Sequence, residues 1–106
     1  MSLSDKVARI KVDISKTIGT VCRERFWIDC YGAYDIHPRH LVYWICVDSD
    51  REKTKLAGNV ELMNSLRNIL AVHEYPIEGR PFVHIGFESE ETVARESGGN
   101  WYYHFK

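Results

Sequence analysis

The sequence predicts an α+β fold in which about four mostly antiparallel strands form one sheet and two main helices cover one face of it. Three observations predict this two-layer sandwich. An uninterrupted apolar run spans residues 41–47, two segments carry apolar residues at helical spacing, and three further segments combine β-branched and aromatic residues between turn signals. The expected order is helix, strand, strand, helix, strand, short helix, strand, within a single domain over residues 1–106.

The central strand is predicted at residues 41–47, which read Leu-Val-Tyr-Trp-Ile-Cys-Val. This length is typical of a strand and too short for a helix that is buried on all sides. Alternation directs Leu41, Tyr43, Ile45 and Val47 to one face and Val42, Trp44 and Cys46 to the other. Because both faces are apolar, we expect helices to cover one, and a helix, a ligand or a second copy of the chain to cover the other.

Two amphipathic segments predict the main helices. Residues 4–19 carry one apolar stripe formed by Val7, Ile10, Ile14 and Ile18. A second helical region begins in the acidic segment 48–52 and is interrupted near Gly58. Asn59 then caps a main helix of about 13 residues, which ends at Tyr75-Pro76.

The remaining strands are predicted on either side of these helices. Residues 22–31 form the first strand, and the short loop that follows predicts antiparallel pairing with the central strand. Residues 82–88 form the third strand, and residues 101–105 form a fourth strand at the end of the chain. Between these two, Ser89 caps a two-turn helix that Gly98-Gly99 terminates.

Charge and composition exclude several classes of protein. The formal net charge is −1, from 14 basic and 15 acidic residues that are interspersed along the chain. A protein held on nucleic acid by phosphate contacts carries a basic excess or stripe, so nucleic-acid binding is disfavoured. The three cysteines have no CxxC spacing, and no segment resembles a signal peptide or a membrane span. We therefore expect a cytoplasmic protein that does not enter membranes.

The histidines do not form a metal-binding pattern. The chain has five, at positions 37, 40, 73, 84 and 104, and none belongs to an HxH or HExxH motif. The only glycine pair, Gly98-Gly99, is followed by a predicted strand, whereas a phosphate-binding loop leads into the beginning of a helix. The sequence therefore predicts no metal site and no cofactor.

One group of residues could support acid–base chemistry. His84 and Glu88 are four residues apart and share a strand face, and His104 could join them if the last strand lies alongside. Such a group supplies a base near neutral pH and a carboxylate that orients it. A small enzyme that uses His84, Glu88 and His104 is therefore one functional hypothesis. The alternative for the same residues is a solvated sheet face with one cross-strand pair.

The aromatic residues favour a different hypothesis. Helices on one sheet face can bury only half of the aromatic side chains on the predicted strands, so the rest lie on the opposite face among a few polar groups. We favour a protein-interaction or small-ligand-binding module that uses this face, with a protein partner or a homodimer as the cover. Its expected contact residues are Trp27, Tyr31, Trp44, Tyr102 and His104.

Overall fold

The structure is a computed structural model that describes residues 2–105. The helices and strands follow the order α1 (Leu3–Gly19), β1 (Phe26–Tyr31), β2 (Val42–Val47), α2 (Asp50–Ala57), α3 (Val60–Val72), β3 (His84–Ser89), α4 (Glu90–Ser97) and α5 (Trp101–His104). Two short 3-10 helices, η1 (Pro38–His40) and η2 (Arg80–Phe82), lie just before β2 and β3. None of the helices within residues 2–105 is long and apolar enough to cross a membrane.

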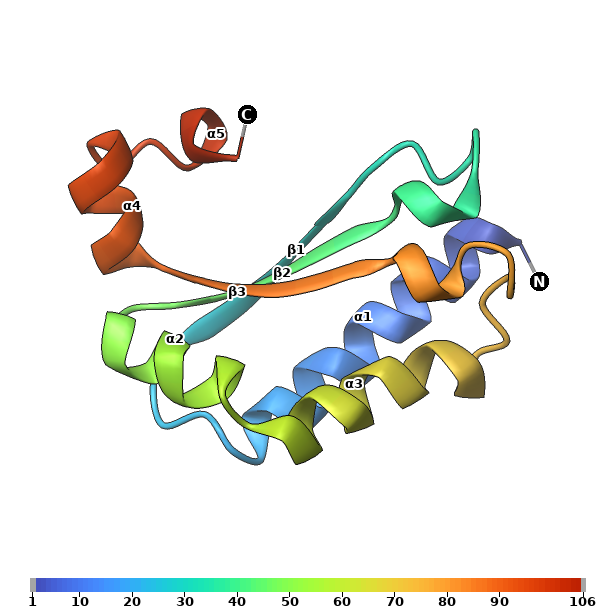
Figure 1. The fold of residues 1–106 in the computed structure, drawn as a ribbon, viewed down its shortest axis with the longest axis horizontal. Helices are drawn as coiled ribbons and strands as arrows, with labels where there is room; N and C mark the ends of the chain where they lie inside the picture. The colour runs from blue at the N-terminus through green and yellow to red at the C-terminus, as the bar shows by residue number, and fades with distance from the viewer. Residues whose placement is uncertain (1, 106) are drawn as a thin grey trace.

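The three strands form one sheet in the order β1-β2-β3, so β2 is central as predicted. β1 pairs with β2 in the antiparallel sense, and β3 pairs with β2 in the parallel sense. Helices α1 and α3 lie side by side on one face of this sheet, and the chain's last helices lie on the other side (Figure 1). The two-layer α/β arrangement is confirmed at this level.

The two main helices form where the apolar spacing predicts them. The stripe of Val7, Ile10, Ile14 and Ile18 on α1 is buried. Helix α2 ends at Gly58, and the Asn59 side chain accepts a hydrogen bond from the Leu62 N–H to begin α3, which has the predicted 13 residues.

The core lies between these helices and the sheet. Leu41, Tyr43, Ile45 and Val47 are fully buried on the helix side, together with Leu66 and Leu70 of α3. The Tyr43 hydroxyl donates a hydrogen bond to the Val7 carbonyl, 2.8 Å away, and so satisfies its polar group within the core.

The predicted number and direction of strands were wrong. The described residues form a three-stranded sheet in place of four mostly antiparallel strands, and β2 and β3 are parallel. The parallel pairing arises because α2 and α3 return the chain to the end of the sheet where β2 begins. The outer strands are also shorter than predicted, since β1 begins at Phe26 and β3 at His84.

The predicted fourth strand at residues 101–105 is the helix α5, so the predicted element order fails at this last element. Gly98 ends α4 in the left-handed conformation, with a φ of 59°. The Asn100 side chain then accepts a hydrogen bond from the Tyr103 N–H at 2.8 Å, which begins a new helical turn. These two local signals override the strand preference of the aromatic residues.

Candidate functional site

The candidate site lies on the sheet face that α1 and α3 do not cover. Alternation and register place three cross-strand rows of side chains on this face. From one end of the sheet to the other, the rows are Trp27-Cys46-Glu88, Asp29-Trp44-Gly86 and Tyr31-Val42-His84.

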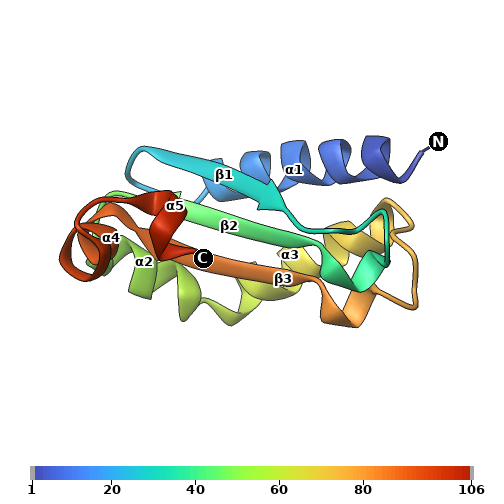
Figure 2. The same cartoon turned by 90° about the horizontal axis from the view of Figure 1, so that it is seen from above.

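Helices α4 and α5 cover one end of this face. In Figure 2, α5 lies in front of β1 and β2, on the side away from α3. Helix α4 is held at its beginning by Asp50 of α2. The Asp50 carboxylate accepts hydrogen bonds from the Ser89 and Thr92 hydroxyls and forms an ion pair with Arg95. These hydrogen bonds lower the pKa of Asp50 well below its usual range, so the carboxylate that ties α2 to α4 stays ionised.

Aromatic contacts fix α5 on the sheet. The Trp101 ring packs edge-on against Trp27, with centroids 5.1 Å apart. Phe105, which follows α5, stacks on Trp44 at 4.9 Å and also contacts Tyr31 at 6.4 Å. We call these five residues the aromatic junction, and they join α5 to β1 and β2.

The sheet face has room for the Trp44 ring because residue 86 is glycine. A Cβ atom built on Gly86 would lie 2.8 Å from the Trp44 ring and 2.5 Å from the His84 imidazole. Trp44 therefore lies across Gly86, between His84 at 4.7 Å and Phe105 at 4.9 Å, and its Nε1–H donates a hydrogen bond to the Tyr31 hydroxyl.

A network of hydrogen-bonded polar side chains lies beside the aromatic junction. His104 Nε2 is 2.8 Å from the Glu88 carboxylate, and His104 Nδ1 is 2.9 Å from the Ser97 hydroxyl. The other oxygen of Glu88 accepts hydrogen bonds from Lys53 Nζ at 2.7 Å and from the Ser89 N–H at 3.0 Å. Glu88 thus joins α2, β3 and α5 through one carboxylate.

The ionisable groups on this face respond to burial and to one another. Burial would raise the pKa of Glu88, but hydrogen bonds from Lys53, His104 and the Ser89 N–H hold it below its ordinary value. Burial, with the Asp29 and Glu88 carboxylates nearby, raises the pKa of the Cys46 thiol to about 12. The thiol therefore stays protonated at neutral pH and is a poor nucleophile.

Of the five predicted contact residues, Trp27, Tyr31 and Trp44 belong to the aromatic junction, and Tyr102 and His104 lie on α5. Trp27 and Trp44 are half-buried beneath Trp101 and Phe105. Tyr31 and Tyr102 are exposed, with 43% and 78% of their surface accessible. His104 lies inward, with 12% of its side chain accessible.

The predicted acid–base residues are brought together only in part. Glu88 and His104 are in contact. His84 does not join them, because it packs against Trp44, and the Trp44 and Phe105 rings lie between His84 and His104. Sequence reasoning missed Ser97 and Lys53, because their contacts depend on how α2 and α4 pack. The cap signal at Asn100 was the one local sign that His104 belongs to a helix.

No group of three or more His, Cys, Asp or Glu side chains within residues 2–105 is arranged to hold a metal ion. Comparison of the chain with protein-family models, with curated proteins and with solved structures found no match.

Proposed function

We propose that the protein is an interaction module that forms a homodimer through an exposed tyrosine surface. This surface consists of Tyr31, Tyr102 and Tyr103, which expose 43%, 78% and 67% of their area. Tyr102 and Tyr103 belong to α5, and the Tyr31 ring contacts Phe105 at the end of that helix. Three accessible tyrosines around one short helix are the observation that carries the proposal, because tyrosine is enriched in protein interfaces.

The chemistry of tyrosine supports a second copy of the chain as the partner. A symmetric dimer requires a surface that is complementary to itself. A tyrosine ring offers a negative face and a positive edge, and its hydroxyl both donates and accepts hydrogen bonds, so tyrosines can pair with tyrosines. The formal net charge of −1 adds little repulsion between two copies.

The aromatic junction would give this surface its rigidity. Trp101 and Phe105 are already packed on Trp27 and Trp44, so α5 presents its tyrosines from a preformed position. A preorganised surface loses less conformational entropy on association than a mobile one.

Native mass spectrometry and light scattering over a range of concentrations test the proposal. We expect a dimer for the wild-type chain and a monomer after the combined change of Tyr31, Tyr102 and Tyr103 to serine. Ile77→Ser provides the matched control, because Ile77 is 74% exposed and lies outside the tyrosine surface. The control should remain dimeric, and circular dichroism should show that both variants are folded.

A wild-type chain that stays monomeric at high concentration contradicts the homodimer. A monomer that carries the mass of a bound small molecule would instead support the ligand-binding form of the module, and that mass would identify the class of ligand.

One observation favours a second candidate, a small enzyme with His104 as its base. His104 Nε2 faces the Glu88 carboxylate, which can only accept a hydrogen bond, so in a neutral imidazole the Nδ1 atom is the one that faces the Ser97 hydroxyl, 2.9 Å away. A neutral imidazole held in this way could take a proton from the hydroxyl and so act as a general base.

Hydrolysis of the activated ester p-nitrophenyl acetate tests this candidate. If the chain is such an enzyme, His104→Ala lowers the rate by about a hundredfold, the lower end of what general acid–base catalysis contributes. His84→Ala is the control, because it removes an exposed imidazole at the far end of the row of rings. Equal rates for the two variants would exclude His104 as the base.

A further inference from the structure

β1 is one of the two outer strands of the sheet, and Figure 2 shows it at one margin with β3 at the other. The hydrogen bonds of β2 determine which backbone groups of β1 are free. The His84 N–H bonds the Leu41 carbonyl at 3.1 Å, so Leu41 and every second residue after it bond β3. Val42, Trp44 and Cys46 therefore bond β1.

Three residues of β1 have backbone groups that point away from the sheet. The residues of β1 that pair with Val42, Trp44 and Cys46 are Trp27 and every second residue after it. The N–H and C=O groups of the alternate residues point to the outer edge. In the part of the chain that the structure describes, these outward groups make no hydrogen bond. They belong to Phe26, Ile28 and Cys30.

β1 lacks the features that guard outer strands. Natural edge strands carry proline, lysine or a bulge, or lie under a covering segment. β1 has neither proline nor lysine, it pairs with β2 without a bulge, and only Ile28 of its six residues is buried. Asp29 is its one charged residue.

The outer edge of β3, in contrast, is closed by side chains. Arg67 donates a hydrogen bond to the Val83 carbonyl just before β3, and the Ser89 N–H at its end bonds the Glu88 carboxylate. The outward residues between them, Ile85 and Phe87, are buried. β1 is therefore the edge that can accept another strand.

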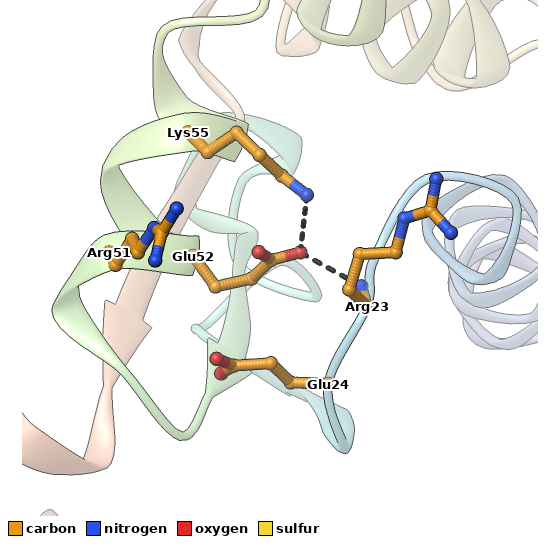
Figure 3. A pocket seen from close by; sticks show the side chains of 5 residues that line it. All are labelled: Arg23, Glu24, Arg51, Glu52 and Lys55. Atoms are coloured by element: carbon orange, nitrogen blue, oxygen red, sulfur yellow. Dashed lines mark hydrogen bonds and ion pairs between the residues drawn. The ribbon is translucent and has the colours of Figure 1, made fainter.

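The segment that leads into β1 is fixed by α2. The Glu52 carboxylate accepts a hydrogen bond from the Arg23 N–H at 2.9 Å and lies 2.8 Å from Lys55 Nζ (Figure 3). Glu24 accepts hydrogen bonds from the Ser49 N–H and the Ser49 hydroxyl. Because the edge is preformed, it loses less conformational entropy on pairing than a mobile segment would.

A two-fold axis at Ile28 matches this edge to itself. Ile28 would lie opposite Ile28 of the second copy, and Phe26 of each copy opposite Cys30 of the other. Facing residues of this kind exchange two hydrogen bonds, so every outward N–H and C=O group of both copies finds a partner. Asp29 then faces Trp27 of the other copy. An axis at Asp29 would instead place two carboxylates opposite each other, which is destabilising.

We infer that two copies of the chain pair through β1, antiparallel and centred on Ile28, so that one sheet continues across both. This inference rests on the proposed homodimer and names the backbone contact between its copies. Tyr31 of the tyrosine surface is the last residue of β1, so the two contacts adjoin. Since the β3 edges are closed, the pairing ends at two copies.

Amide hydrogen exchange of the full chain, read residue by residue below and above the concentration at which native mass spectrometry shows the dimer, tests this pairing. We expect the amides of Phe26, Ile28 and Cys30 to exchange at least about tenfold more slowly in the dimer, because pairing gives each of them an acceptor. The Asp29 amide already bonds β2 and provides the internal control.

Cys30→Pro removes one outward N–H, and an edge strand tolerates proline where that N–H faces outward. This variant should be monomeric, whereas the matched control Cys30→Ser keeps the N–H and should be dimeric. Circular dichroism should show that both variants are folded. If Cys30→Pro does not fold, the exchange of the wild-type chain decides the question.

A dimer whose Phe26, Ile28 and Cys30 amides stay unprotected would overturn this inference and leave the tyrosine surface as the contact. A folded Cys30→Pro chain that is dimeric would overturn it as well. Protection of the same amides in a chain whose three surface tyrosines are serine would support the edge and refute the tyrosine surface. A wild-type chain that is monomeric at every concentration would refute both.

Discussion

At the scale of single residues, the Glu88 carboxylate connects three elements, α2, β3 and α5, on the second sheet face. Its side chain is 10% accessible, yet its two oxygens accept hydrogen bonds from Lys53, His104 and the Ser89 N–H. A buried carboxylate is tolerated only when such partners replace water. The same partners that keep it charged also hold α2 and α5 against β3.

Glu88→Gln should reduce the free energy of unfolding by about 2 kcal/mol at neutral pH, because a hydrogen bond to a charged group contributes about 1.5–3 kcal/mol. The folded-state pKa of Glu88 lies below its ordinary value, so the stabilisation is fully present above the unfolded-state pKa. It is lost as the pH falls through the folded-state pKa.

Urea unfolding of both chains across the acidic range measures this difference. The two stabilities should converge below the ordinary glutamate pKa, near 4.5. A difference that stays constant down to the most acidic pH at which both chains fold would show that the charge of Glu88 is unimportant.

At the scale of elements, α5 depends on few contacts. It has four residues, none of them buried, and it follows Gly98 and Gly99, both of which have positive φ. Its order rests on the Asn100 cap, on the two aromatic contacts with the sheet and on the hydrogen bond to Glu88. A segment with few buried contacts opens locally without unfolding the whole molecule.

Asn100→Ala should therefore free α5 from the sheet and leave the global stability nearly unchanged, whereas Asn59→Ala should reduce the global stability by about 1 kcal/mol. The two residues make the same kind of cap, but α3 lies against the core and α5 does not. Hydrogen exchange of the α5 amides and urea unfolding separate the two effects. Equal losses of global stability would mean that α5 belongs to the main cooperative unit.

At the scale of the whole molecule, the two faces of the sheet are covered in different ways. Two long helices bury the face that carries Tyr43 and Ile45, and this side forms the continuous core. The other face is covered at one end by α4 and α5 through aromatic and polar contacts, and Lys53 of α2 also reaches Glu88 there. The proposed interaction surface lies on this more weakly covered side.

Much of this architecture could be predicted from local sequence signals. The stripe on α1, the Asn59 cap and the apolar run of β2 each identify their elements, because periodicity and capping depend on neighbouring residues. The parallel direction of β3 was also within reach, since a helical crossover between two strands favours parallel pairing. Residues 101–105 were predicted as a strand from their aromatic composition, whereas the Asn100 side chain begins a helix there.

The sequence by itself determined the fold class, the main helices and the central position of β2, because local spacing and apolar patterning specify them. Only the tertiary structure decided that α5 covers the aromatic face and that Ser97 and Lys53 join Glu88 and His104. The physical reason is that these contacts join segments far apart in the chain. Their existence depends on how the helices pack and on the register of the strands, and no short stretch of sequence encodes either.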